Sequence, residues 1–163
     1  MAIALDPRDI KILQILSAEG RISKSELARR VNLSPSPCWE RLRRLEKAGL
    51  IKGYHADIDL ARLAPHVVIF VVVELDQHRA ESFRIFEAAL AGHPQITGCW
   101  AIGGGVDYLM QVTAPDINAY QRMIDDLLEA QIGLRRYFTY VVTKEVRTGG
   151  AGMLAALLGH QID

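Results

Sequence analysis

The side chains with the clearest chemical potential lie on one face of a predicted helix that begins at Pro35 and ends before Gly49, a typical left-handed helix cap. Its apolar stripe is Cys38, Leu42 and Leu45, and a step of about 100° per residue places basic and small polar side chains opposite. Arginine pairs bidentately with guanine edges or binds phosphates, and small hydroxyls near a helix N-terminus permit close backbone approach. We interpret this face as a DNA-reading surface, the alternative being an ordinary solvated face of a helical hairpin. The candidate DNA-binding residues are Ser34, Ser36, Pro37, Trp39, Glu40, Arg43, Arg44 and Lys47.

Two further helices are predicted to position that face. Asp6 followed by Pro7 predicts the N-cap of a first helix. Ser23 and Glu26 have the spacing of a capping box, in which the Ser23 hydroxyl accepts from the Glu26 N–H and the Glu26 carboxylate accepts from the Ser23 N–H. A tight turn ends at Ser34, which is predicted to cap the third helix. The apolar residues at helical spacing in the first two helices are Ile10, Leu13, Leu16, Leu27, Ala28 and Val31.

Charge is divided unequally along the chain. The 163 residues include 19 basic and 19 acidic side chains, and 50% of them are hydrophobic, which is ample for packed cores. Residues 1–55 hold 11 lysines and arginines against 6 acidic residues, whereas residues 56–163 hold 8 against 13. A basic segment attracts a polyanion and an acidic segment is repelled from it. Double-stranded DNA is therefore the expected partner of the first part of the chain.

Other kinds of site have little support. Cys38 and Cys99 form no CxxC pair and the 5 histidines lack ligand spacing, so we expect no metal and no cofactor. No Gly-Lys-Ser/Thr follows the glycines and no Gly-x-Ser-x-Gly occurs, so we expect no enzyme and no catalytic residues. The longest apolar stretch, residues 67–73, is far shorter than the roughly 20 residues that span a bilayer. The first residues lack the pattern of a signal peptide, which predicts a cytoplasmic protein without a membrane partner.

Beyond Ala64 and Pro65 the pattern changes to strands interleaved with helices. The predicted order is strand, helix, strand, strand, helix, strand, which is the βαββαβ order of a ferredoxin-like sandwich. The fold class is therefore α+β, with a winged helix-turn-helix head joined to a ferredoxin-like domain. The predicted strands are 67–75, 96–102, 108–113 and 137–146, and the predicted helices are about 80–90 and 117–129.

This pattern divides the chain into four parts. Residues 50–60 alternate like extended chain and predict a small wing that leads out of the head. We expect a helix-turn-helix DNA-binding domain at 1–52, a wing and linker at 53–65, a ferredoxin-like effector-binding and oligomerisation domain at 66–147, and a tail at 148–163. The tail has four glycines around a short apolar run, and no role is assigned to it.

The first predicted strand of the second part is apolar on both faces. Residues 67–73 read Val-Val-Ile-Phe-Val-Val-Val, whereas a sheet covered by helices on one face only should alternate between apolar and polar. Two predicted helices suffice for one face, so a second subunit is expected to cover the other. The alternative is a central strand that is buried wholly within one chain.

A run of glycines and an aspartate between the second and third predicted strands suits a small zwitterion. Gly103, Gly104 and Gly105 can expose backbone N–H groups to a carboxylate, and Asp107 can meet an ammonium group. The alternative is a glycine-rich hairpin turn, and the residues alone do not favour one reading over the other.

These motifs, in this order, resemble the Lrp/AsnC (leucine-responsive and asparagine-responsive) transcriptional regulators over roughly residues 5–147. The resemblance implies a homodimer that can assemble further to a tetramer or octamer and wrap DNA. It also implies a small-molecule effector, usually an amino acid, bound between subunits, and favours the pocket reading of the glycine run. On the last strand, the matching positions for effector response are Tyr140, Val141 and Val142. The chain departs from the family pattern at Gly103, Gly105 and Val106. The motifs that carry the resemblance are residues 19–23, 33–38, 40–41, 43–46, 53–54, 106–109, 119–120, 139–142 and 145–146.

The predicted function is a sequence-specific DNA-binding regulator that responds to such an effector. An enzyme is the competing class, because ferredoxin-like domains can host catalysis, but no catalytic motif supports it. A third class is a nucleoid-type architectural protein whose second domain only oligomerises. Binding that is independent of effector and weakly selective for sequence would distinguish it.

Overall fold

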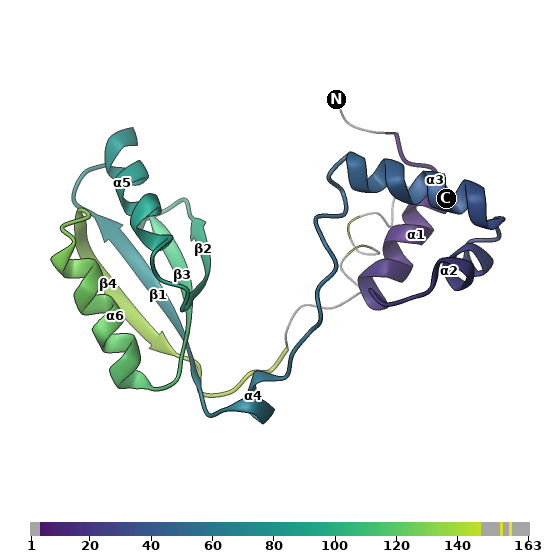
Figure 1. The fold of residues 1–163 in the computed structure, drawn as a ribbon. Helices are drawn as coiled ribbons and strands as arrows, with labels where there is room; N and C mark the ends of the chain where they lie inside the picture. The colour runs from purple at the N-terminus through teal and green to yellow at the C-terminus, as the bar shows by residue number, and fades with distance from the viewer. Residues whose placement is uncertain (1–3, 148–153, 155–156, 158–163) are drawn as a thin grey trace. The chain divides into compact units, whose positions relative to one another are not determined.

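The chain divides into two compact units, and the division falls between Ile58 and Asp59. The computed structural model describes residues 4–147 together with residues 154 and 157, so the predicted tail at 148–163 lies outside the described residues apart from those two positions. The first unit, here called the head, is helical, and the second, here called the sheet unit, holds the strands (Figure 1).

Three helices form the head, as predicted: α1 (Pro7–Ala18), α2 (Lys24–Arg30) and α3 (Pro35–Lys47). Asp6 caps α1, since its side chain accepts from two backbone N–H groups and its own N–H donates to Asp9. Ser23 caps α2 by accepting from the Glu26 N–H at 3.2 Å. The second half of that predicted capping box is wrong, because the Glu26 carboxylate binds Arg29 and Arg30. Ser34 precedes α3 without a side-chain cap bond, and Gly49 follows it at φ 72°.

The head has its own hydrophobic core. The predicted stripe of α3 is buried against residues of the other two helices, which confirms the periodicity seen in the sequence. The fully or nearly buried members of this core are Ile12, Leu27, Ala28, Val31, Cys38, Leu42 and Leu45.

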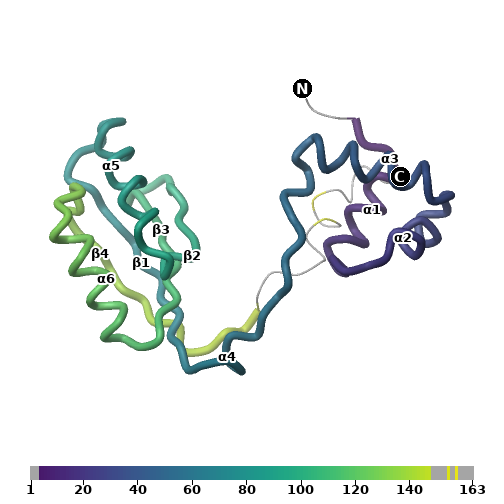
Figure 2. The backbone as a smooth tube through the Cα atoms, in the orientation of Figure 1, coloured from purple at the N-terminus to yellow at the C-terminus, as the bar shows by residue number. Residues whose placement is uncertain are grey.

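The predicted wing contains no strand within the described residues. Residues 50–59 follow an irregular path that is visible in the backbone trace (Figure 2), and a short helix, α4 (Leu60–Leu63), comes next. The alternating sequence pattern favours an extended chain, but a strand also needs a neighbouring strand to bond its N–H and C=O groups. The described part of the head contains no strand that could pair with this segment.

The sheet unit has the predicted βαββαβ order. Its elements are β1 (Val67–Leu75), α5 (Ala80–Leu90), β2 (Ile96–Ala101), β3 (Tyr108–Ala114), α6 (Ile117–Glu129) and β4 (Leu134–Val141). The strands form one antiparallel sheet in the order β2-β3-β1-β4, with β1 and β3 in the centre. This arrangement confirms the α+β, ferredoxin-like prediction for this part of the chain.

The limits of β4 differ from the predicted 137–146. The strand begins at Leu134, directly after Gly133, whose φ of 78° allows the chain to turn into the sheet. It ends at Val141, which pairs with Ile69 of β1. One more bond joins the Val142 N–H to the Val68 carbonyl, and β1 itself begins at Val67, so the following residues have no partner strand left.

The two faces of the sheet differ in how they are covered. Both α5 and α6 pack on one face, where alternate residues of β1 from Ile69 to Leu75 are fully buried (Figure 1). The intervening residues of β1 point to the opposite face, here called the outer face, and keep partial exposure. The outer face is largely apolar, and Trp100, Phe138 and Tyr140 on it are 48%, 42% and 57% exposed. Its apolar members are Val68, Phe70, Val72, Trp100, Leu109, Phe138 and Tyr140.

Candidate DNA-binding face and ligand-binding loop

The polar face of α3 is exposed along its whole length. Seven of the eight predicted DNA-binding residues are exposed and Trp39 is half-buried, because the core stripe on the opposite side fixes the rotation of the helix. The exposed members are Ser34, Ser36, Pro37, Glu40, Arg43, Arg44 and Lys47.

Trp39 joins α3 to α2 as well as bordering the exposed face. Its ring packs against the core of the head, and the Lys24 ammonium lies 3.4 Å from the ring centroid. A cation over an indole ring is attracted by the negative face of the π-system. Lys24 therefore adds a positive charge beside the predicted DNA-binding face, which the sequence pattern alone did not indicate.

Arg43 and Arg44 are neighbours in sequence but differ in their contacts. Arg43 is exposed and has no ion-pair partner among the described residues. Arg44 donates from Nη2 to the carboxylate of Asp9, which is fully buried on α1. Arg41 donates to the other oxygen of the same carboxylate at 2.9 Å. Replacement of Arg44 is therefore expected to affect the head as well as its exposed face, because this side chain helps to neutralise a buried charge.

The cluster of Asp6, Asp9 and the two arginines ties the start of α1 to α3. The backbone N–H of Asp9 that bonds to Asp6 lowers the pKa of that carboxyl below its ordinary value, and Arg41 lowers it further. The Asp6 carboxylate in turn raises the pKa of the Arg41 guanidinium. These contacts stabilise the charged forms of Asp6 and Arg41.

A second group of ion pairs lies on α2. Glu26 accepts from Arg29 and from Arg30, and these bonds lower the pKa of its carboxyl to about 2. Arg30 also binds Glu19, which directly follows the end of α1. Arg29 and Arg30 of α2 are thus paired with nearby carboxylates, whereas Arg43 on α3 has no ion-pair partner among the described residues.

The glycine run forms the connection between β2 and β3 and is exposed. A Cβ added to Gly103 or Gly105 would meet nothing within 4 Å, and only Gly104, at φ 137°, has a backbone conformation that favours glycine. Packing within the chain therefore does not require glycine at two of the three positions. Close approach of another molecule to the backbone is a physical reason for keeping side chains away.

Asp107 is not a free carboxylate. Its side chain is nearly buried, accepts from the Leu75 N–H at 2.8 Å and lies 3.0 Å from Nε2 of His78. Its backbone N–H donates to the Val73 carbonyl. Asp107 thus bonds the end of β1, and a ligand ammonium group would have to share an oxygen that already has a partner. His78 is an exposed neighbour of the glycine run that sequence reasoning missed, since a lone histidine carries no distinguishing spacing.

The two halves of the predicted effector site lie at opposite ends of β1. Asp107 bonds to Val73, whereas Val141 pairs with Ile69. At roughly 3.3 Å per residue these positions are about 13 Å apart along the strand. One chain therefore does not bring the glycine run together with Tyr140, Val141 and Val142.

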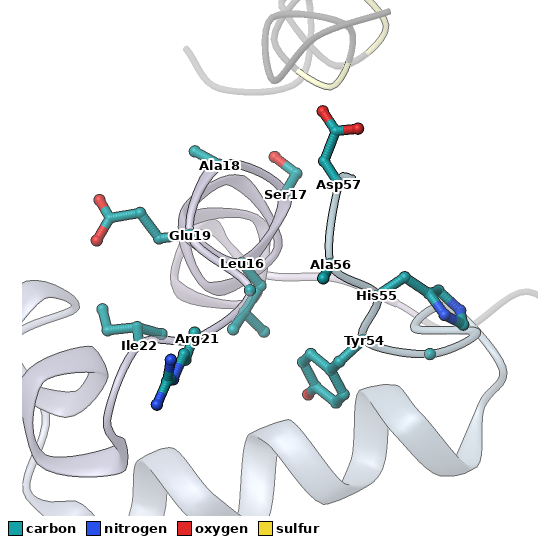
Figure 3. A pocket seen from close by; sticks show the side chains of 12 residues that line it. Leu16, Ser17, Ala18, Glu19, Arg21, Ile22, Tyr54, His55, Ala56 and Asp57 are labelled. Atoms are coloured by element: carbon teal, nitrogen blue, oxygen red, sulfur yellow. The ribbon is translucent and has the colours of Figure 1, made fainter. Parts of the chain in front are cut away.

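An open hollow of about 1060 Å³ lies in the head beside the irregular segment that follows α3 (Figure 3). The end of α1 lines one side of it, and residues 53–57 line the other. Tyr54 belongs to this lining, and its hydroxyl donates to Glu46 of α3 at 2.9 Å. Burial and this carboxylate raise the pKa of Tyr54 to about 12. None of the predicted effector-binding residues lines this hollow.

Metal-binding groups and membrane-spanning helices are both absent from the described ranges. Within residues 4–147 and the two described tail positions, no group of three or more His, Cys, Asp or Glu side chains is arranged to hold a metal ion. Across the same residues, no helix is both long enough and apolar enough to cross a membrane. Cys38 and Cys99 are both free thiols.

A helix-turn-helix head joined to a ferredoxin-like unit defines the chain as a two-domain DNA-binding regulator. Residues 5–52 match the winged helix-turn-helix DNA-binding family, and residues 68–151 match the Lrp/AsnC ligand binding domain. The chain belongs to the Lrp/AsnC family of transcriptional regulators.

Its relatives agree with this assignment. The chain is 52% identical over 149 residues to the transcriptional regulatory protein DoeX of Halomonas elongata, covering 91% of this chain and 94% of that protein. It is 39% identical over 143 residues to the leucine-responsive regulatory protein of Salmonella typhimurium, covering 88% of this chain and 87% of that protein. A solved structure of a transcriptional regulator from Neisseria meningitidis in complex with L-Met matches with a TM-score of 0.85 at 34% identity, covering 95% of this chain and 100% of that one.

Proposed function

We propose that this regulator reads specific DNA sequences through α3 and that a small molecule, an amino acid, bound between two subunits changes its DNA binding. The observation that carries the DNA part is the exposed face of α3, where Arg43 and Lys47 have no ion-pair partner among the described residues. Guanidinium donors on an exposed helix suit guanine edges and phosphates. The acidic partners of Arg29 and Arg30 on α2 leave that helix less suited to DNA.

Replacing Arg43 with alanine should weaken binding to a preferred DNA fragment by about 1–3 kcal/mol if the side chain reads a base. The fragment is first selected from a random double-stranded library, and affinity is then measured by fluorescence anisotropy at several salt concentrations. The fold should be unaffected, because Arg43 makes no ion pair in the described part of the chain. Arg43→Lys keeps the charge but loses the planar fork, so it separates base reading from phosphate binding.

Arg122→Ala is the matched control, since it removes the same charge from an exposed position on α6 in the sheet unit. Its affinity should equal that of the wild type. Unchanged affinity for Arg43→Ala and Lys47→Ala together would exclude α3 as the DNA-contacting helix. Equal affinity of the wild type for selected and unrelated fragments would instead favour the architectural class.

Three features support an effector site between subunits. The glycine run is exposed and two of its glycines are not required by packing within the chain. The residues on β4 that would complete the site lie at the other end of β1. The outer face of the sheet is apolar and open to a second copy. A two-fold axis that crosses the strands would bring the glycine run of one subunit over the end of β4 in its partner.

A thermal-shift screen of the free amino acids should identify the effector. One or a few of them should raise the Tm by an amount that grows with concentration, because a ligand that binds only the native state stabilises it. L-Met, present in the Neisseria meningitidis complex, is the first to test. Gly103→Val should abolish the shift without strain, since a Cβ there has open space and φ is ordinary. A Tm that stays constant for every amino acid up to millimolar concentration would contradict an amino-acid effector.

A further inference from the structure

A buried carboxylate lies directly behind the exposed face of α3. Asp9 on α1 is fully buried, and it is the one buried charged side chain among the residues that the structure describes. Its Oδ1 accepts from Arg41 at 2.9 Å, and its Oδ2 accepts from Arg44 and from the backbone N–H of Asp6 at 3.1 Å. Both oxygens are therefore occupied, and two of the donors belong to α3.

Stability alone is a weak explanation for this arrangement. Burying a charge costs free energy that its ion pairs only partly offset, and apolar replacements of such clusters are often as stable. Arg44 is also an unusual partner, because its side chain is 48% exposed while the carboxylate that it binds is 0% exposed. One guanidinium nitrogen binds Asp9, and the other two have no hydrogen-bond partner in the described residues. A guanidinium offers five N–H donors in a fixed fork, so most of them stay available.

We propose that Asp9 is a positioning residue for DNA recognition, which holds the Arg44 guanidinium in one orientation on the exposed face of α3. This inference rests on the proposed DNA-reading role of that helix. Ordering a long side chain during binding costs conformational entropy and so lowers the affinity. A side chain that is already held in place does not incur this cost. Arg43 and Arg44 therefore act differently: Arg43 becomes ordered on the DNA, and Arg44 is oriented before it arrives.

The substitution Asp9→Asn keeps the size of the side chain and one acceptor but removes the charge that holds Arg44. Affinity for the selected DNA fragment should fall about 3- to 10-fold, the scale expected for ordering one long side chain on binding. Affinity for unrelated DNA should not fall, because the head becomes more positive by one charge. The informative quantity is therefore the affinity for the selected fragment divided by the affinity for unrelated DNA, here called the selectivity ratio. A loss of fold would lower both affinities together and leave this ratio unchanged.

Glu26→Gln is the matched control. It also removes one negative charge and also breaks pairs with two arginines, but those arginines lie on α2. Its selectivity ratio should equal that of the wild type. An equal fall in the ratio for both variants would overturn the positioning role, because it would show a general effect of charge.

A double-mutant cycle tests whether Asp9 acts through Arg44. Arg44→Gln removes the guanidinium and leaves Arg41 to neutralise Asp9. Once Arg44 is absent, Asp9→Asn should cause no further loss of selectivity. Losses that add fully in the double variant would overturn the inference.

Measurement on the unmodified protein avoids any folding defect of the variants. The Nε–Hε order parameter of Arg44, measured by NMR relaxation without DNA, should be clearly higher than that of Arg43, and a value below about 0.6 for Arg44 would overturn the inference. If Arg43→Ala and Arg44→Gln both bind selected DNA like the wild type, the proposed role of α3 fails and the inference fails with it. If both lose affinity while Asp9→Asn keeps its selectivity, the positioning inference alone fails.

Discussion

Val72→Glu is expected to make the protein monomeric by preventing the dimerisation that we propose, and to lower affinity for the selected DNA fragment by about 10²–10⁴-fold, the gain that linking two binding modules typically gives. Val72 lies in the centre of the outer face, where it pairs with Leu109 on one side and Phe138 on the other. A second subunit seated there would bury the new carboxylate without a partner, at a cost of several kcal/mol. In the monomer the same side chain keeps contact with water, so the fold should survive.

Sedimentation velocity distinguishes the two states, since one chain has a mass of 18.1 kDa. Ile117→Glu is the control, because it places the same charge at an exposed apolar position at the start of α6, on the side of the sheet unit that carries the helices. That variant should remain dimeric and bind DNA normally. Dimers of Val72→Glu at micromolar concentration would show that subunits do not associate through the outer face.

Mixed dimers should show whether two subunits share each effector site. Gly103→Val blocks the glycine run and Tyr140→Ala removes an exposed side chain near the end of β4. Homodimers of either variant should bind none of the amino acid identified by thermal shift. A mixed dimer pairs one chain carrying Gly103→Val with one chain carrying Tyr140→Ala. It should bind one ligand for every two chains, because one of its two sites then combines the unaltered Tyr140 of the first chain with the unaltered Gly103 of the second. Calorimetric titration of dimers purified through two different affinity tags gives this stoichiometry.

The reciprocal mixed dimer is the control. It pairs a chain carrying both substitutions with a wild-type chain, so that each shared site contains one altered half. A shared site predicts no binding in this dimer, whereas a site within one chain predicts one bound ligand. The two mixed dimers therefore give opposite results under the two arrangements. Each must first be shown to be dimeric, since Tyr140 lies on the outer face.

Local patterns were sufficient to predict most elements from the sequence. Helical spacing of apolar residues located α1, α2 and α3, because a side chain three or four positions away on a helix always shares its face. The same rule identified the exposed residues of α3, and the continuous apolar run at 67–73 located β1. The prediction was wrong where an element depends on a neighbour: residues 50–60 have no partner strand, and β4 ends where β1 begins.

The amino-acid sequence by itself determined the class of this protein, a helix-turn-helix head followed by a ferredoxin-like unit. It also determined which face of α3 is polar, because periodicity and capping act over a few residues. Only the tertiary structure decided which of those polar residues form ion pairs with other parts of the chain. Arg44 binds an aspartate 35 residues away, and Asp107 binds a backbone N–H that is 32 residues distant. Such bonds depend on how separate elements pack, and no local pattern encodes the distance between them. For the same reason only the register of the sheet showed that the glycine run and the end of β4 lie too far apart to form one site within a chain.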